Sequence, residues 1–151
     1  MRFLIGSFVV ITLGCGAGEG VAPALPSNYA DSYQEVRNCR YSIDHGLVNI
    51  RVLAAPEALA AYTNRTEAFP VGAIIVKEEY AEMDAACGGT LLQLTVMQKL
   101  EPETSPAMLD WHWEKISPAR KVLESDDQKC ISCHTDCGKP PDGYDGTCTV
   151  P

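Results

Sequence analysis

The residues best suited to chemistry lie near the C-terminus, where the chain reads Cys130-Ile131-Ser132-Cys133-His134. Two thiols three positions apart, followed at once by an imidazole, form the pattern by which a c-type haem is attached covalently. Each thiol adds to a haem vinyl group, and the imidazole becomes the proximal ligand of the iron. We therefore predict one haem c per chain, with thioether bonds at Cys130 and Cys133 and iron ligation by His134.

Two other uses of these thiols are consistent with the sequence. One is a disulfide between Cys130 and Cys133, and the other is a zinc or iron–sulfur site that recruits Cys137 and Cys148. Zinc ribbons normally need two well-spaced cysteine pairs, whereas Cys137 and Cys148 follow the first pair at unequal intervals. The spacing therefore favours haem.

The second axial position of the iron has no obvious ligand in the sequence. No methionine follows the motif, so a sixth ligand has to come from upstream. The upstream candidates, none with a convincing ligand context, are Met83, Met97, Met108, His45 and His112. We predict an open distal position, which suits iron that binds diatomic gases or nitrogen oxides, whereas six-coordinate iron suits electron transfer.

The first residues are typical of an export signal. Arg2 precedes an apolar run from Phe3 to Leu13, which is shorter than the roughly 20 residues of a membrane span. Gly14 before Cys15 resembles a bacterial lipoprotein cleavage site, with a lipid on Cys15, and ordinary cleavage near Ala22 is the alternative. We predict a signal over residues 1–14, a flexible tether over 15–26 and one haem c domain over 27–151. The protein would then be periplasmic and would touch the membrane only through its lipid anchor.

The charge and the cysteines narrow the function further. The formal net charge is −8 and becomes −9 without the leader, whose only charged residue is Arg2, so nucleic acid is excluded as a partner. Seven cysteines in a small exported chain indicate disulfides. Besides Cys15 and the motif, four cysteines can pair in three ways. We favour Cys39 with Cys87 and Cys137 with Cys148, because the second pair closes a short loop behind the haem helix, and free thiols are the alternative.

The hydrophobic pattern predicts a mainly β (α+β) fold, with an antiparallel sheet, a few short helices and a C-terminal helix that carries the haem motif. Strands are expected over 47–53, 73–80 and 92–100, and a further sheet face at Leu109, Trp111 and Trp113. Helices are expected over 27–37 and, behind Pro56, over 57–62. Ser125-Asp126-Asp127-Gln128 matches a capping box at the start of the motif helix, and 138–146 is rich in turn residues.

Several segments together resemble the cytochrome P-460 family. They are the C-terminal motif, residues 69–78 (Phe-Pro-Val-Gly-Ala-Ile-Ile-Val-Lys-Glu), residues 94–97 (Leu-Thr-Val-Met) and Trp111. The resemblance covers about residues 29–134 and implies an antiparallel sheet, a homodimer and a five-coordinate haem c. In the cytochromes P-460 proper a lysine is cross-linked to the haem and the protein oxidises hydroxylamine or nitric oxide. The related cytochromes c′-beta lack that activity and bind nitric oxide or carbon monoxide.

The resemblance also suggests which side chains would decide between these activities. Lys77 occupies the place of the cross-linking lysine, and strand alternation puts it on the face of Ala73 and Ile75. The alternative is that Lys77 ends the strand in solvent, as Glu78 and Glu79 would. Oxidation of hydroxylamine requires a proton acceptor, for which a carboxylate such as Glu79 or Glu114 is a candidate.

Three functions therefore stay open from the sequence. The first is an oxidoreductase that oxidises hydroxylamine or nitric oxide and passes the electrons to a periplasmic acceptor. The second is a non-enzymatic binder of nitric oxide or carbon monoxide, similar to cytochrome c′-beta. The third is a six-coordinate electron-transfer cytochrome c.

Overall fold

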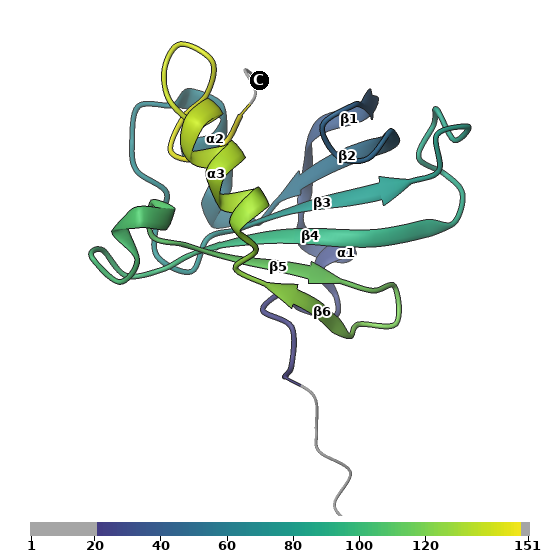
Figure 1. The fold of residues 1–151 in the computed structure, drawn as a ribbon, viewed down its shortest axis with the longest axis horizontal. Coiled ribbons are helices and arrows are strands. Elements are labelled where there is room, and N and C mark those ends of the chain that lie inside the picture. Colours follow the sequence, from purple (N-terminus) through teal and green to yellow (C-terminus); the bar gives the residue numbers. More distant parts are fainter. Residues whose placement is uncertain (1–20, 149–151) are drawn as a thin grey trace, which may run out of the picture.

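The main element of the structure, a computed structural model that describes residues 21–148, is one antiparallel sheet of six strands (Figure 1). The strands pair in chain order: β1 (Gln34–Ser42), β2 (Val48–Ala54), β3 (Ile74–Tyr80), β4 (Leu91–Lys99), β5 (Trp111–Ile116) and β6 (Val122–Ser125). Strands β2, β3 and β4 coincide within one or two residues with the strands that the hydrophobic pattern predicts. The predicted mainly β fold is confirmed.

Cross-strand pairing gives the central strands two distinct faces. Residues that are directly opposite on neighbouring strands share a face, and successive residues alternate between the faces. The face that we call the cavity face carries the rows Ile75–Met97–Trp113 and Lys77–Thr95–Lys115. The opposite face, which we call the back face, carries the rows Val76–Val96–Glu114 and Glu78–Leu94–Ile116. Each face thus combines buried apolar residues with a few polar ones.

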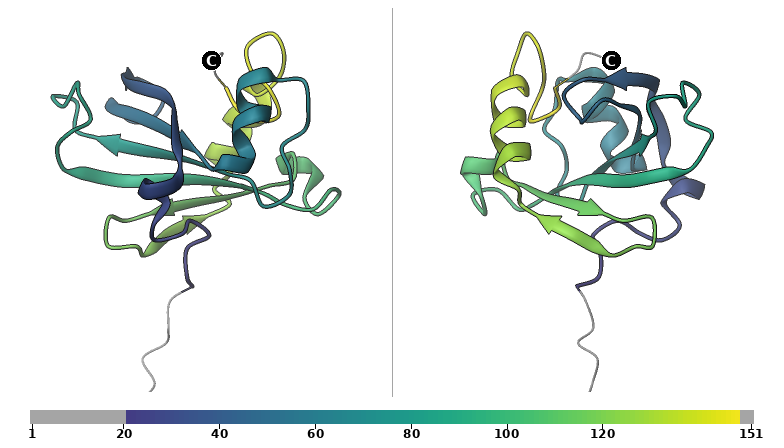
Figure 2. Two further views of the ribbon diagram at one scale, coloured as in Figure 1. Left: turned by 180° about the vertical axis from the view of Figure 1, so that it is seen from behind. Right: turned by 45° about the vertical axis from the view of Figure 1, so that its right-hand side comes forward.

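Short helices cover both faces of the sheet (Figures 1 and 2). On the cavity side are α2 (Leu59–Asn64), which continues a 3₁₀ turn at Pro56–Ala58, and α3 (Gln128–Cys137). Proline at the first position of the 3₁₀ turn suits a helix start, because its missing N–H has no intrahelical acceptor there. A second 3₁₀ turn, Pro106–Met108, lies in the connection between β4 and β5. The one-turn helix α1 (Tyr29–Ser32) belongs to the N-terminal segment, which packs on the back face.

The back face is closed by this N-terminal segment and by a buried polar cluster. Leu25 is 1% exposed, although it falls within the tether that the composition predicts. The carboxylate of Glu78 accepts hydrogen bonds from the hydroxyls of Tyr29 and Tyr80, both at 2.8 Å, and from Arg51 Nε at 2.7 Å. A buried carboxylate with three donors is compensated for its lost hydration. The alternative in which the strand ends in solvent at Glu78 and Glu79 is wrong, since both are less than 5% exposed.

Two local predictions are also wrong. The helix predicted over 27–37 ends at Ser32, because residues from Gln34 onward form an edge strand that pairs with β2. The predicted capping box fails because Ser125 ends β6 and Asp127 is the N-cap of α3, its carboxylate accepting the Lys129 N–H at 2.7 Å. A four-residue strand such as β6 carries too few residues for its periodicity to be recognised.

The disulfides agree with the predicted pairing. Cys39 is bonded to Cys87, and Cys137 is bonded to Cys148, so neither Cys137 nor Cys148 is available to a zinc site. Cys130 and Cys133 are not paired. Two disulfides fit an exported protein. The predicted signal and Cys15 lie outside the described residues, and within 21–148 no helix has both the length and the apolar character of a membrane span.

Candidate haem site

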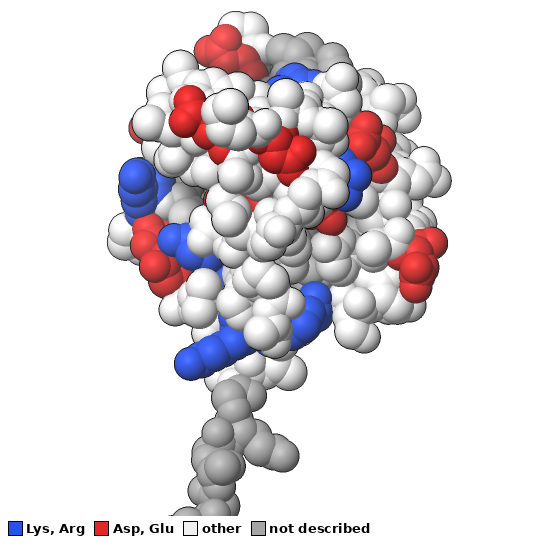
Figure 3. Space-filling view, turned by 90° about the vertical axis from the view of Figure 1, so that its right-hand side faces the viewer, with Lys and Arg blue, Asp and Glu red and all other residues white. Residues whose placement is uncertain are grey.

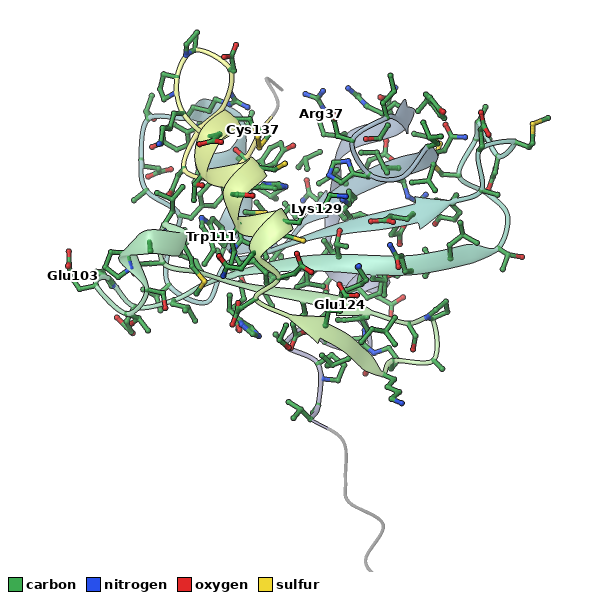
Figure 4. All side chains as sticks on the ribbon, in the orientation of Figure 1. Arg37, Glu103, Trp111, Glu124, Lys129 and Cys137 are labelled. Atoms are coloured by element: carbon green, nitrogen blue, oxygen red, sulfur yellow. A yellow bond between two sulfur atoms is a disulfide. The ribbon has the colours of Figure 1, made fainter. Side chains whose placement is uncertain are left out.

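A cavity of about 590 Å³ lies between α3, the β1–β2 hairpin and the cavity face of the sheet. This volume is in the usual range for small-molecule and cofactor sites. Cys130, Cys133 and His134 all line it from α3, and Figure 4 labels Lys129 and Cys137, which border it from the first and last turns of that helix. Its apolar wall includes Ile50, Val52, Ile75, Met97 and Trp113. The structure therefore brings the three motif residues to one hollow.

The orientation of α3 follows from its sequence. Cys130, Cys133 and His134 are at positions i, i+3 and i+4, which lie on one side of a helix. Ile131 is 6% exposed and packs into the core, which fixes the helix against the sheet. Asp127 caps the first turn, and the disulfide at Cys137 ties the last turn to the tail. Both ends of the attachment helix are thus held in place.

The tail also fixes the ring of His134. Its Nδ1 lies 2.6 Å from the carbonyl oxygen of Gly146 and donates to it, which leaves Nε2 to act as a ligand. The Trp113 ring packs edge-on against the imidazole, with 4.6 Å between ring centres. Burial lowers the pKa of His134, which favours the neutral imidazole. The sequence predicts only an irregular tail here, because a backbone carbonyl that acts as a hydrogen-bond acceptor has no sequence signature.

The tail itself rests on the edge of the core near β4 and β5. Trp111 Nε1 donates to the carbonyl oxygen of Asp145 at 2.8 Å, and Lys99 Nζ lies 2.9 Å from the Asp145 carboxylate. Gly146 adopts a φ of 84°, a left-handed conformation that glycine adopts without strain. A side chain at Gly143 would collide with the Cys137 carbonyl oxygen. The tail is therefore closely packed behind α3.

Lys77 and Glu79 lie side by side on the cavity face. Lys77 Nζ is 3.3 Å from Glu79 Oε1, and their side chains are 14% and 4% exposed. Gln93 Nε2 donates to the other carboxylate oxygen at 2.6 Å, and Thr95 adds a longer contact. Burial lowers the pKa of the Lys77 ammonium, while the charge of Glu79 opposes this change. Lys77 therefore lies inside the cavity rather than at a strand end in solvent, and Gln93 and Thr95 are partners that the sequence did not single out.

Glu114 has different surroundings from Glu79. Glu114 is one of the residues that border the cavity, but alternation places its side chain on the back face, away from that of Trp113. The carboxylate accepts the Ala24 N–H at 2.9 Å and lies 3.4 Å from His112 Nε2. His112 in turn contacts Asp126 through Nδ1 at 3.0 Å. Of the two predicted proton acceptors, the structure brings only the Glu79 carboxylate to Lys77.

The structure shows which of the five candidates for a sixth ligand lie at the cavity. Met83 is 93% exposed, His112 is held by Asp126 and Glu114, and Met108 is not part of the cavity wall. His45 and Met97 do line the cavity. His45 comes from the turn between β1 and β2, and burial lowers its pKa to about 3, with the positive charge of Lys77 as a smaller cause.

The donor set of the cavity suits a haem. The group needs two thiols, an imidazole with a free Nε2 and an apolar wall, and all of these are present. Trp113 Nε1 is buried and has no hydrogen-bond partner among residues 21–148. Burial raises the pKa of the Cys130 thiol, and the nearby Lys77 charge opposes this.

The comparisons with known proteins agree with this geometry. The family model described as Cytochrome P460 matches residues 27–140, which is most of the chain and includes all of the cavity wall except Thr147 and Cys148. A search of curated proteins finds no match to this sequence.

Proposed function

The chain belongs to the cytochrome P460 family, and from this we propose that it is an exported haem c protein that binds hydroxylamine or nitric oxide at its iron. The observation that carries the proposal is that Cys130, Cys133 and His134 meet the Lys77–Glu79 pair at one cavity. A haem held there would supply a redox-active iron, with the capacity to bind a nitrogen compound and to transfer electrons to a periplasmic acceptor.

The residues of the chain have separate roles in this proposal. Cys130 and Cys133 form the thioethers, in which each S–H adds across a vinyl C=C bond, so no oxidant is consumed. His134 ligates the iron, and the Gly146 carbonyl fixes its tautomer. Glu79 accepts protons from hydroxylamine, since its carboxylate lies on the cavity wall, where a bound ligand can reach it. Ile75 and Trp113 exclude water.

Lys77 is the side chain that we propose to modify the haem. A bond between Nζ and a porphyrin carbon removes one hydrogen from each, which is a two-electron oxidation, and we propose a peroxide as the oxidant. The lowered pKa of Lys77 supports this role, because only the neutral amine is nucleophilic. Without the cross-link the same cavity would bind nitric oxide without turnover, which is the second function that we retain.

Mass spectrometry of the haem peptide tests the proposal. The protein is produced in cells that carry a cytochrome c maturation system and is digested with a protease. We expect haem on the peptide that contains Cys130 and Cys133, and a cross-linked second peptide that contains Lys77. A colourless product of unmodified mass would overturn the proposal, and haem without the second peptide would leave the binding function and remove the enzymatic one.

A matched pair of variants separates the cross-link from general effects of charge. Lys115 also borders the cavity, but its amine is bound to Glu124 at 2.6 Å. We expect the lysine cross-link to shift the absorption band of the ferrous haem to longer wavelength. Lys77→Arg keeps the charge and should abolish the cross-linked peptide, this red-shifted band and the hydroxylamine oxidation, whereas Lys115→Arg should keep all three. Equal behaviour of the two variants would contradict the assignment of Lys77.

A further inference from the structure

We propose that His45 is the second axial ligand of the haem iron and holds the distal position until a nitrogen oxide displaces it. This inference rests on the proposed function, because it concerns the same haem and the same small ligands. It replaces the expectation of a permanently open distal site with a site that a side chain of this chain occupies at rest.

The position of His45 in the fold is the first argument. In Figure 1, α3 and the β1–β2 hairpin stand on the same side of the sheet. Both elements line the cavity, with His134 from α3 and His45 from the turn of the hairpin. Asp44 and Gly46, the neighbours of His45 in the turn, border the cavity as well. A haem attached to α3 through its two thioethers would therefore have His134 from α3 and the β1–β2 turn on either side.

The distance between the two rings is the second argument. The centres of the His45 and His134 rings are 6.5 Å apart, with 56° between the ring planes. A metal–imidazole nitrogen bond is about 2 Å long, so two imidazoles on one metal ion have ring centres about 6 Å apart. A distal histidine that only donates a hydrogen bond to an iron-bound ligand would need a larger separation, because the ligand atoms lie between the iron and the ring. The observed distance therefore favours direct coordination.

The hydrogen bonds of the two rings are the third argument. His45 Nδ1 lies 2.6 Å from Ser42 Oγ, and His134 Nδ1 lies 2.6 Å from the Gly146 carbonyl oxygen. In each ring Nδ1 is thus occupied by the protein and Nε2 is the nitrogen that remains for iron. Histidine ligands are usually oriented in this way by a partner on the other ring nitrogen.

The other side chains at the cavity fit the distal position less well. Met97 is on the side of His134, because its terminal methyl lies 3.6 Å from the place that a Cβ on Gly146 would occupy. Lys77 is paired with Glu79.

His45 lies in the turn between β1 and β2, outside both strands. In this turn Gly46 and Leu47 adopt positive φ values of 91° and 62°. Ile43 and Leu47 of this turn are 71% and 53% exposed, so movement of the turn does not disturb the core.

A displaceable ligand lowers the apparent affinity for gases in a predictable way. If the distal position is free only a small fraction of the time, the apparent dissociation constant rises by the inverse of that fraction. We expect His45→Ala to increase the rate of carbon monoxide association with the ferrous protein at least about tenfold.

Optical and electron paramagnetic resonance spectra of the ferric protein with its haem attached test the proposal directly. We expect the unmodified protein to be low-spin and six-coordinate, and His45→Ala to be high-spin and five-coordinate. Added imidazole restores the low-spin spectrum of His45→Ala. The control is His112→Gln, since His112 contacts Asp126 and Glu114 on the back face and should leave the spectra unchanged.

The outcomes of this experiment separate the inference from the proposed function. A protein without covalent haem overturns both. A haem-bearing protein that is high-spin before mutation overturns the inference alone. A low-spin spectrum that persists in His45→Ala overturns it as well, because another side chain is then the ligand. If His45→Ala does not fold, His45→Met replaces it, and a methionine–iron charge-transfer band in that variant supports the assignment, whereas an unchanged spectrum contradicts it.

Discussion

At the residue scale, the Lys77–Glu79 pair is where this cavity differs most from a purely apolar haem pocket. An ammonium and a carboxylate 3.3 Å apart in a largely buried wall stabilise each other, and Gln93 satisfies the remaining carboxylate oxygen. Removal of one partner leaves the other without compensation, which costs more than the net value of the pair. The pair is thus a sensitive point for both stability and chemistry.

Glu79→Gln tests the proton-accepting role. The amide keeps the size of the side chain and the contact with Gln93 but cannot take up a proton. We expect the rate of hydroxylamine oxidation to fall about 10²-fold, in line with general base catalysis, while nitric oxide binding to the ferrous protein changes little. Steady-state kinetics and stopped-flow binding measure the two effects. Glu124→Gln on the cavity rim is the control, and a similar loss in both variants would count against Glu79.

Sequence reasoning succeeds at this scale where a motif defines the chemistry. Cys130, Cys133 and His134 are recognisable because their spacing alone places them on one side of a helix. It fails for Glu78, because a charged residue at a strand end gives no indication that Tyr29 and Arg51 will be folded against it. For Glu79 it indicates a pocket carboxylate but not its partner Gln93. The role of Gly146 is likewise invisible, since the group that contacts His134 is its backbone carbonyl.

At the element scale, the attachment helix α3 is ten residues long and depends on fixed ends. Its N-terminus is capped by Asp127 and its C-terminus is bound to the tail through Cys137–Cys148. An isolated helix of this length is marginal in water. The geometry of Cys130, Cys133 and His134 therefore depends on these two clamps.

Asp127→Ala removes the N-terminal clamp. We expect a loss of about 1 kcal/mol in the free energy of unfolding, the usual cost of a lost N-cap. Urea denaturation of the protein with its haem attached, followed by circular dichroism, gives this value. Asp142→Ala, an exposed change in the tail, should stay within about 0.5 kcal/mol of the unmodified protein. A loss as large in Asp142→Ala would show that Asp127 has no special role.

The double variant Cys137→Ser/Cys148→Ser removes the C-terminal clamp. The disulfide closes a loop with a sequence separation of 11, so we expect a loss of about 3 kcal/mol in the free energy of unfolding. The Gly146 carbonyl is in this loop, and loss of its hydrogen bond with His134 Nδ1 should shift the haem reduction potential as well. Unfolding curves and spectroelectrochemistry measure the two quantities. A destabilised protein with an unchanged potential would contradict the link between the tail and His134.

The elements themselves are predictable to different degrees. The strands β2 to β4 have alternating or continuous apolar residues over seven or more positions, and they are found where the pattern places them. The segment around Tyr33 has helical spacing of its aromatic residues, yet it becomes strand β1 because β2 offers backbone hydrogen-bond partners. Tertiary pairing of this kind overrides local preference and cannot be seen in one segment.

At the scale of the whole molecule, tyrosines that are buried or half-buried make the fold sensitive to alkali. Burial and the hydrogen bond to Glu78 raise the pKa of Tyr80 to about 12, and burial also raises the pKa of Tyr33 to about 12. In the unfolded chain these hydroxyls ionise near pH 10, so between about pH 10 and 12 unfolding releases protons. We expect the free energy of unfolding to fall steadily through this window. Tyr80→Phe should flatten the dependence, and an unchanged slope would contradict the assignment.

The distribution of charge over the surface is a second property of the whole molecule. Acidic and basic side chains are interspersed on the face shown in Figure 3, so the net charge of −8 is not gathered there into one patch.

We propose that the protein is a homodimer, and sedimentation equilibrium of the protein with its haem attached tests this.

We also propose that a lipid on Cys15 holds the protein at the membrane. The full chain should enter the detergent phase on phase partitioning, and Cys15→Ala should stay in the aqueous phase. Equal partitioning of both proteins would show that Cys15 carries no lipid.

The chain order of the strands has a consequence for how the protein is assembled. Each strand pairs with the one made just before it, and the attachment helix follows the last strand. A polypeptide that leaves a ribosome or a translocation channel N-terminus first therefore presents the complete sheet before Cys130 emerges. The enzymes that ligate porphyrin would then act on a chain whose sheet has already formed and whose two thiols emerge last.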